Sequence, residues 1–504
     1  MDRRRGRASA AAPLPGLQEL RASAAPRLPL LPLGERGSGG RGRHGRGGQL
    51  HGQSPEVPSG LRGALCHRAH RHRWRAGRVP HQQHRRLPGG LGRFRRSGEG
   101  DLPAAGRRLA AAVREARLMT VDEAYISGIG QSEIAVKQKR HPLLLTLDAV
   151  REALDEAGLG IGQIDGVSTY PGRVPAFLGF SPVGADELID ALGIRARWYA
   201  GGGEITSQLG AVVAAATAVR AGLARHVICF RTVYEAAALA RPEEYPPLRR
   251  DRVDGHSQWF APFGAISAAN WTAQYAMRHV KRYGLTREQL AQIALTDRAN
   301  ACRNPRALVR EPLTMDEYLS ARMISSPLCL YDCDRFTDAS TVIIVSAGGA
   351  LDEVRCTPVR IAAMAGTVER HSWDQAEWMA CYPTGAELWK HADYKPADVD
   401  TVQLYDGFSF QAVAWLESLG FCGVGEGGRF IEGGRRIALD GELPLNTFGG
   451  QIGAGRLHGF GFAHEAVVQL RGKGGERQIA GDPKVAVATS GGGPLATALL
   501  LARD

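Results

Sequence analysis

The chain has 504 residues, enough for two or three domains, and a formal net charge of +12. Residues 1–118 hold 25 arginines, no lysine and 7 acidic residues, a net charge of +18, which leaves 38 basic and 44 acidic residues in 119–504, a net charge of −6. The basic balance therefore gives no reason to expect nucleic-acid binding by residues 119–504.

Two further absences limit the class of protein. No apolar run approaches the roughly 18–20 residues that cross a bilayer, so we expect no membrane span. The eight cysteines are scattered, with no CxxC pair, and no signal peptide opens the chain. We therefore expect no disulfides and no metal site, and we expect the protein to be cytoplasmic.

Residues 1–118 are rich in Arg, Gly, Pro, Ala and His, and three interpretations are open. They could form a disordered basic tail, or a transit peptide or nucleic-acid-binding arm. We favour a third interpretation, in which a GC-rich gene has been translated in the wrong frame. GC-rich codons that are read out of frame give many arginines and no lysine. Suitable codons for 103–119, shifted by one base, give QRLDDDWLLPFVKRA and a stop that overlaps the start codon of Met119. We expect Met119 to be the true start, with another gene immediately upstream.

The rest of the chain alternates short apolar strands with amphipathic helices, which favours an α/β fold. Apolar residues at helical spacing and a glycine near the end predict a helix at 141–159. A second predicted helix, at 206–224, is rich in alanine. The predicted strands are 124–130, 226–230, 341–348 and 359–369, and the predicted helices are 141–159 and 206–224.

Three ordered motifs occupy the C-terminal part: YDGFS at 405–409, LNTFGGQIGAGRLHG at 445–459 and ATSGGG at 488–493. They resemble the HDCFS, NPxGGxxxxGHPxGATG and terminal glycine-rich segments of sterol-carrier-type thiolases, and most of all the thiolase-like aldolases of steroid side-chain degradation. The resemblance implies a thiolase fold, two similar halves at 119–355 and 356–504 in a five-layer αβαβα sandwich, usually dimeric.

The residues of thiolytic chemistry are replaced. A thiolase needs a nucleophilic cysteine at the start of a buried helix; its position falls near Ile205, with no cysteine close by. The histidine of the GHP motif corresponds to Arg456, and the second catalytic cysteine to Thr489. Acyl-enzyme chemistry is therefore not expected.

The candidate catalytic residues are those of the first two motifs. Tyr405 is the proposed base, provided that its neighbours lower its pKa, although it could instead be a core aromatic. Arg456 stands where the resembling aldolases carry a second tyrosine; a guanidinium group is no base, but it could stabilise a phenolate or an enolate. His458 is either catalytic or a hydrogen-bonded structural residue. Asp406, in the same motif as Tyr405, completes the set.

The residues expected to bind the thioester oxygen come from the glycine-rich loops. They are Asn446, Gly449, Gly450, Gly491, Gly492 and Gly493. Asp334 and Asp338, in YDCDRFTDAS, are expected to brace the loop. Trp259, Phe260 and Phe263, in a variable insertion, could line an apolar pocket or pack within their loop. No cofactor is implied beyond the coenzyme A of the substrate.

The resemblance implies retro-aldol cleavage of a β-hydroxyacyl-CoA, such as one with a steroid side chain, without a nucleophilic cysteine. The alternatives are acetyl-CoA acetyltransferase or β-ketoacyl-CoA thiolase activity, and a non-catalytic subunit that binds acyl-CoA or lipid. The expected partners are a second copy of the chain and a small zinc-ribbon/OB-fold protein encoded upstream, because shifted codons around 49–55 and 79–85 give sequences like those of such proteins.

Overall fold

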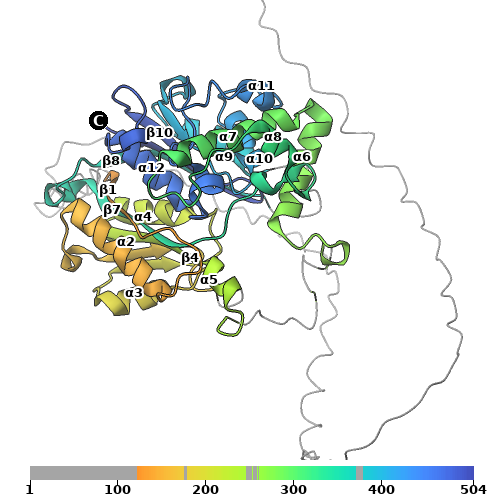
Figure 1. Cartoon of the computed structure of the whole chain (residues 1–504). Coiled ribbons are helices and arrows are strands. Elements are labelled where there is room, and N and C mark those ends of the chain that lie inside the picture. Colours follow the sequence, from red (N-terminus) through yellow and green to blue (C-terminus); the bar gives the residue numbers. More distant parts are fainter. Residues whose placement is uncertain (1–121, 175–178, 246–252, 254–257, 259, 370–378) are drawn as a thin grey trace, which may run out of the picture. The chain divides into compact units, whose positions relative to one another are not determined.

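The structure, a computed structural model, describes residues 122–174, 179–245, 253, 258, 260–369 and 379–504 (Figure 1). The extension 1–118 and Trp259 lie outside the described residues. The expected α/β architecture is confirmed. Among the described residues no helix is long and apolar enough to cross a membrane.

Among the described residues, nine strands form one continuous sheet in the order β3-β2-β4-β7-β1-β8-β11-β10-β9. The N-terminal half contributes β1 (Ala124–Gln131), β2 (Gly166–Thr169), β3 (Trp198–Gly201), β4 (His226–Tyr234) and β7 (Asp338–Ala347). The C-terminal half contributes β8 (Val359–Val368), β9 (Thr401–Gln403), β10 (Val485–Gly491) and β11 (Leu495–Ala502). The halves join where Tyr125 and Ile126 of β1 pair with Arg360 and Val359 of β8. The expected strands at 124–130, 226–230, 341–348 and 359–369 are confirmed as β1, β4, β7 and β8.

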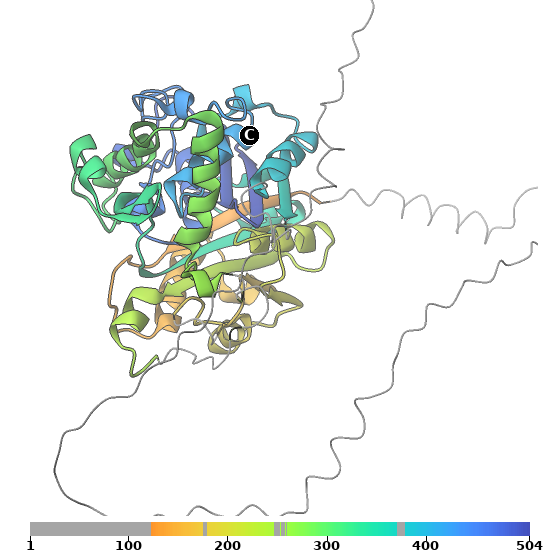
Figure 2. The same cartoon turned by 90° about the vertical axis from the view of Figure 1, so that its right-hand side faces the viewer.

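Helices cover and separate the two sets of strands (Figures 1 and 2). The helices α4 (Gly210–Arg220) and α12 (Phe460–Leu470) contact strands of both halves and so lie between them. On the far side of the N-terminal strands lie α2 (Pro142–Ala157) and α3 (Ala185–Leu192). On the far side of the C-terminal strands, α9 (Cys381–Lys390) covers β8 and β11, and α10 (Ser409–Ser418) packs on α9.

The connection from β4 to β7 holds most of the remaining elements. These are α5 (Glu235–Ala240), α6 (Ala268–Tyr283), α7 (Arg287–Cys302), α8 (Met315–Ser320) and the hairpin of β5 (Met323–Ser325) and β6 (Leu328–Cys329). After α10 come α11 (Gly427–Ile431) and a π-helical turn, η7 (Gly450–Ala454). Because α7 contacts both η7 and α10, this connection reaches the C-terminal motifs.

The local sequence explains how α2 packs on β1. Pro142 opens the helix, where the missing N–H costs nothing, and Gly158 closes it in the left-handed conformation with φ 70°. A Cβ atom at Gly130 of β1 would lie 2.1 Å from the carbonyl oxygen of Ala149. A side chain at Gly130 would therefore push the helix away from the strand.

The second predicted helix is shorter than expected. It begins at Gly210 instead of residue 206. Ser207 and Gln208 form the turn before the first helical residue, and hydrogen bonds to distant parts of the chain hold both side chains. Side-chain anchoring of this turn competes with helix formation.

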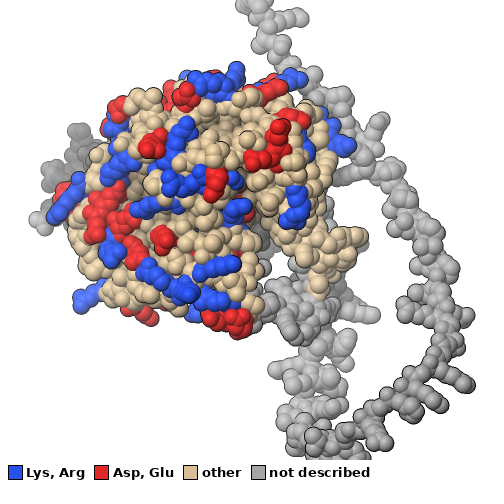
Figure 3. All heavy atoms as spheres, in the orientation of Figure 1, with Lys and Arg blue, Asp and Glu red and all other residues tan. Residues whose placement is uncertain are grey.

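Surface charge on the described residues is mixed. Figure 3 shows acidic and basic side chains interspersed over the face that carries α2 and α12. This distribution agrees with the small negative net charge of residues 119–504 and does not form the basic stripe of a nucleic-acid-binding face.

Candidate active site

The three C-terminal motifs meet in space. Residues 404–408 connect β9 to α10, and residues 455–459 connect η7 to α12. The terminal glycine loop lies between β10 and β11, and β10 pairs with β9. The sheet therefore brings the separate motifs together beside the turn that precedes α4.

Tyr405 lies in the core, two residues after the end of β9. Its backbone N–H donates to Oγ1 of Thr489 at 2.8 Å, and its ring centroid lies 5.8 Å from that of Phe462. Burial raises the pKa of Tyr405 well above the ordinary value of about 10, and the charge of Arg456 opposes the rise only in part. The condition for Tyr405 to act as the base, a lowered pKa, is therefore not met, because burial outweighs the neighbours that lower it. At neutral pH the phenol is therefore protonated.

Arg456 holds a fixed positive charge between two carboxylates. Its Nε lies 3.4 Å from Oδ2 of Asp334 and its Nη1 lies 3.4 Å from Oε1 of Glu235. Its guanidinium carbon lies 5.9 Å and 5.3 Å from the ring centroids of Phe180 and Phe336. These contacts fix the guanidinium group where it can stabilise a developing enolate.

Asp334, expected only to brace the loop, belongs to the same charged cluster. Its backbone N–H donates to the carbonyl oxygen of Gly407 at 3.1 Å, which ties it to the YDGF turn. Burial raises the pKa of Asp334 to about 7. Arg456 opposes this rise, and the negative charges of Glu235 and Asp406 add to it. Asp334 therefore titrates close to neutral pH.

His458 is held between a guanidinium group and an amide. Its Nδ1 accepts a hydrogen bond from Nε of Arg231 at 2.9 Å, so the neutral ring carries its proton on Nε2. Nε2 lies 3.0 Å from the amide nitrogen of Gln208, whose Oε1 has no partner among the described residues. Turning this amide over gives a normal N–H···O bond. Burial and the charges of Arg231 and Arg456 keep the pKa of His458 well below its ordinary value. This favours the structural interpretation of His458.

Asp406 and Asp297 form a buried pair of carboxyl groups beside η7. Oδ1 of Asp406 accepts the N–H of Gln451 at 2.9 Å, and Oδ2 accepts that of Ile452 at 3.3 Å. Asp297 reaches the same place from α7. A Cβ atom at Gly450 would lie 2.1 Å from Oδ2 of Asp406 and 2.9 Å from Cγ of Asp297. Only glycine fits between the two acids.

The pKa values of both carboxyl groups are raised. Burial raises the pKa of Asp406 to about 6, and burial together with the charge of Asp406 raises that of Asp297 well above its ordinary value. Two carboxylates this close do not ionise together. Asp297 is therefore the protonated partner, and Asp406 acts as an acceptor that positions η7. This role differs from the catalytic role expected for Asp406.

The expected thioester-binding residues do not all offer free donors. The N–H of Gly449 donates to the carbonyl oxygen of Asn446 at 2.8 Å, and that of Gly492 donates to Leu495 at 2.7 Å. Oδ1 of Asn446 accepts from the N–H of Leu404 at 2.7 Å. Gly449 and Gly492 therefore hold the loops together, and in this conformation their N–H groups are not free donors. Nδ2 of Asn446 has no hydrogen-bond partner among the described residues, so thioester binding by Asn446 stays a prediction.

The other three expected glycines are fixed by their surroundings. Gly450 opens η7. The carbonyl oxygen of Gly491 accepts from Nε1 of Trp415 at 3.1 Å, and that of Gly493 accepts from the N–H of Ala380 at 2.7 Å. Thioester binding by Gly450, Gly491 and Gly493 stays a prediction.

Gln451 contributes an amide that the expected set did not contain. The residue is fully buried, and neither its Nε2 nor its Oε1 has a hydrogen-bond partner among the described residues. The amide lies close enough to the hydroxyl group of Tyr405 to favour its ionised form. A buried polar group without a partner costs about 1–3 kcal/mol. Such a group at this position is suited to binding a substrate oxygen atom.

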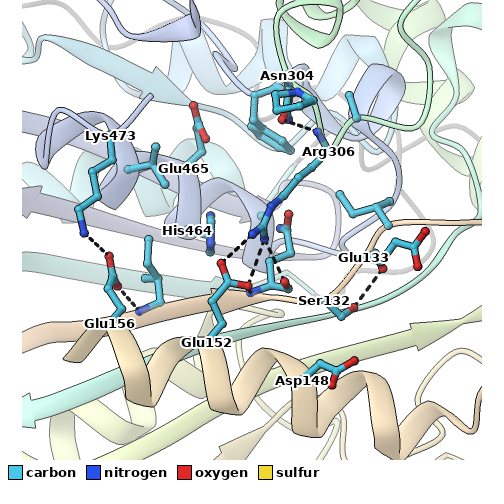
Figure 4. A pocket seen from close by; sticks show the side chains of 18 of the residues that line it. Ser132, Glu133, Asp148, Glu152, Glu156, Asn304, Arg306, His464, Glu465 and Lys473 are labelled. Atoms are coloured by element: carbon cyan, nitrogen blue, oxygen red, sulfur yellow. Dashed lines mark hydrogen bonds and ion pairs between the residues drawn. The ribbon is translucent and has the colours of Figure 1, made fainter. Parts of the chain in front are cut away.

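A separate cavity of about 1090 Å³ lies between α2, α12 and residues 304–307. Figure 4 shows Arg306 paired with Glu152 and Lys473 paired with Glu156 in this cavity. None of the expected catalytic or thioester-binding residues lines it. Ion pairs already satisfy these four charged groups, and we do not take the cavity as the active site.

The insertion after β4 is only partly described. Phe263, expected to line an apolar pocket or pack in its loop, is 85% exposed and borders a surface pocket of about 470 Å³ with Met277 and Ser325. Its companion Trp259 lies outside the described residues.

Comparisons with known proteins decide the family. Residues 365–502 match the family model described as Thiolase C-terminal domain-like. A steroid side-chain-cleaving aldolase of Thermomonospora curvata is 30% identical over 395 residues, 76% of this chain and 98% of that protein. The chain belongs to the thiolase superfamily, among its thiolase-like aldolases.

Two further similar proteins match the same share of this chain. A 17-hydroxy-3-oxo-4-pregnene-20-carboxyl-CoA lyase of Mycobacterium tuberculosis is 31% identical over 397 residues, 76% of this chain and 100% of that protein. The solved structure of an Ltp2-ChsH2(DUF35) aldolase matches with a TM-score of 0.67 and 29% identity, over 76% of this chain and 98% of that one. The expected thiolase fold is confirmed.

Against the thiolase pattern, the start of α4 carries no thiol. The residue that reaches the terminal glycine loop is Ser207, whose Oγ lies 2.5 Å from that of Ser490. Ser207 lies two residues after Ile205, the position where the sequence placed the nucleophile of a thiolase. The cysteine closest along the chain is Cys229, buried in β4. Burial raises the pKa of its thiol far above the ordinary value.

Three buried residues of the site were missed from the sequence. Arg231 had a usable signal, because a charged residue interrupts the strand HVICFRTVY. Asp297 lies within the polar helix REQLAQIALTDRANAC, where nothing distinguishes it from surface residues. Gln451 occupies a variable position of the glycine-rich motif. Only the fold brings Asp297 and Gln451 to the site.

Proposed function

We propose that this chain cleaves a β-hydroxyacyl-CoA of the steroid side-chain class by a retro-aldol reaction. The observation that carries the proposal is the composition of the site. The protonated Tyr405, the fixed guanidinium group of Arg456 and Asp334, a carboxyl group with a pKa of about 7, lie close together in a thiolase fold. The turn before α4 carries no thiol. The full-length match to the two aldolases adds the substrate class.

The reaction needs no covalent intermediate. A base removes the proton from the β-hydroxyl group, the C–O bond becomes a carbonyl, and the Cα–Cβ bond breaks. The released electron pair forms a thioester enolate, which Arg456 stabilises with the buried amide of Gln451 as a hydrogen-bond donor. Tyr405 returns a proton to Cα, because its raised pKa keeps it protonated at neutral pH. The products are a ketone and a shorter acyl-CoA.

We also propose that the active form is a dimer that works with a small zinc-ribbon/OB-fold partner in the cytoplasm. Support for the dimer comes from β3, which lies at an edge of the sheet and exposes 63% of Tyr199. An unpaired edge of this kind is a site for strand pairing. Support for the partner comes from the matching Ltp2-ChsH2(DUF35) aldolase, whose name joins two components. Light scattering of the chain with and without the partner tests both points.

The test of function uses the substrate in the name of the mycobacterial relative. The chain is incubated with 17-hydroxy-3-oxo-4-pregnene-20-carboxyl-CoA, alone and with the small partner, and the products are followed by mass spectrometry. A 17-ketosteroid and a shorter acyl-CoA in equal amounts support the proposal. Tight binding without cleavage in either mixture contradicts it and favours the acyl-CoA-binding subunit.

A further inference from the structure

Retro-aldol cleavage requires a group that accepts the β-hydroxyl proton, and most groups of this site are unsuited to that task. Arg456 is a guanidinium group and cannot accept a proton. Tyr405 is protonated because burial raises its pKa. Nδ1 of His458 already accepts a hydrogen bond from Arg231. Among these groups none is a free base at neutral pH.

Both carboxylate oxygens of Asp406 already accept backbone N–H groups of η7. Glu235 and Asp334 remain, and their positions differ. Glu235 and Asp334 both pair with Arg456 at 3.4 Å. The negative charge of Asp334 reaches Tyr405, which carries the other catalytic proton, and raises its pKa. Glu235 instead acts on Arg231 and Arg456. Of the two, Asp334 is therefore the carboxylate whose charge acts on the phenol.

We infer that Asp334 is the catalytic base that takes the β-hydroxyl proton, an inference that rests on the proposed retro-aldol function. Within the described residues its carboxylate forms the ion pair with Arg456 and accepts no hydrogen bond. Its side chain is 11% exposed, so a substrate hydroxyl can approach it. The backbone bond from Asp334 to Gly407 fixes it relative to the YDGF turn.

The step balances without a further reactant. The hydroxyl O–H bond breaks and its proton goes to a carboxylate oxygen of Asp334. The oxygen electron pair forms the new C=O bond, and the Cα–Cβ electron pair passes into the thioester enolate. The proton of Tyr405 then goes to Cα. Proton exchange with water returns Asp334 and Tyr405 to their starting forms.

The charges around Asp334 suit a base that works near neutral pH. Arg456 favours its ionised form, whereas burial and the charges of Glu235 and Asp406 favour the protonated form. The thiol of Cys333, also nearby, is kept neutral because burial and the charges of the adjacent aspartates raise its pKa. The balance places the pKa of Asp334 at about 7, close to the optimum for general-base catalysis.

The test compares Asp334→Asn with Glu235→Gln, the matched change in the other carboxylate that pairs with Arg456. Both variants are assayed for cleavage across the pH range, and circular dichroism and thermal unfolding check the fold. Asp334→Asn should lower kcat by about 10²–10⁴-fold, with little change in KM, and abolish the acidic limb of the kcat profile. Glu235→Gln should retain that limb and move it to lower pH, because Glu235 raises the pKa of Asp334.

The outcomes separate the inference from the proposed function. If the wild-type protein does not cleave the substrate, the proposed function fails. If it does, and Asp334→Asn is folded, active within about tenfold and keeps the limb, only the inference is overturned. If Asp334→Asn does not fold, the Glu235→Gln profile decides. If the acidic limb of the kcat profile moves to lower pH in Glu235→Gln, the result supports Asp334 as the base. If that limb is unmoved or absent, the inference is overturned.

Discussion

Nε of Arg231 donates a hydrogen bond to Nδ1 of His458 at 2.9 Å, and both residues are buried. Because of this bond, His458 of the GRLHG motif is a neutral hydrogen-bond acceptor. The bond also explains why a buried arginine is tolerated in β4. Nη1 of Arg231 donates to the carbonyl oxygen of Thr232 at 2.9 Å and Nη2 to that of Phe180 at 2.5 Å, so each of the three guanidinium nitrogen atoms donates a hydrogen bond.

His458→Asn should therefore retain most of the activity. Asparagine tolerates the left-handed backbone at this position (φ 49°), and its oxygen can accept the bond from Arg231. We expect kcat to fall by less than about tenfold and the limbs of its pH profile to stay in place. A loss of about 10²–10⁴-fold in a folded variant, the usual effect of removing an acid–base group, would instead make His458 catalytic.

Tyr405→Phe should abolish cleavage while the fold survives. Phenylalanine preserves the ring contact with Phe462 and removes only the hydroxyl group. We expect kcat to fall by about 10²–10⁴-fold, with a change of only a few degrees in Tm. Tyr170→Phe is the matched control, since Tyr170 is another buried tyrosine, 6.2 Å from the ring of His458. Equal losses in both variants would show that the effect of Tyr405 is not specific.

Alkylation of cysteines should leave the activity intact. Burial raises the pKa of Cys229, Cys329, Cys333, Cys356, Cys381 and Cys422. The thiolate is the reactive form, so none of these thiols is activated as a nucleophile requires. Treatment with iodoacetamide, followed by an assay and a peptide map, checks this. Inactivation that substrate prevents would restore the thiolase alternative.

The stability of Asp297→Asn relative to the wild-type protein should increase as the pH rises. Because the pKa of Asp297 is raised in the folded state, the unfolded state releases its proton first. The slope of unfolding free energy against pH is then negative, and the stability due to this group declines above about pH 4. The asparagine variant lacks this decline but can still donate to Asp406.

Thermal unfolding between about pH 4 and pH 8 measures this effect. The Tm of Asp297→Asn minus that of the wild type should increase with pH. Asp352→Asn, a change at an exposed aspartate of the same type, should show no such trend. A difference that stays constant across this range would mean that Asp297 and Asp406 do not share a proton.

Gly450→Ala should damage the site more than the fold. The alanine Cβ would lie 2.1 Å from Oδ2 of Asp406 in a residue with φ 58°. To relieve this clash, Asp406 must give up its bond to Ile452, and η7 must move with Gln451. We expect Gly450→Ala to lower the free energy of unfolding by about 1–3 kcal/mol. We also expect kcat to fall by a larger factor in Gly450→Ala than in Gly433→Ala. The control, Gly433, has φ 70° but open space around its Cβ position.

The order of motifs was enough to predict the fold class and the place of the site, because ordered segments of a family determine its topology. The chemistry of the site was less accessible. The spacing of YDGFS identifies Tyr405, but its pKa depends on burial that only packing creates. Asp334 was assigned only a bracing role, because the sequence does not reveal its contact with Arg456. That contact joins the segment before β7 to a loop more than a hundred residues later. Asp297 and Gln451 carry no pattern that distinguishes them from surface residues.

The proposed function depends above all on carbon–carbon cleavage through an enolate, without an acyl-enzyme. Cleavage in D₂O without added coenzyme A, followed by mass spectrometry of both the small products and the intact protein, tests this step. We expect a ketone, an acyl-CoA with one deuterium at Cα, and a protein of unchanged mass. A requirement for free coenzyme A, together with an acyl group attached to the protein, would refute cleavage through an enolate.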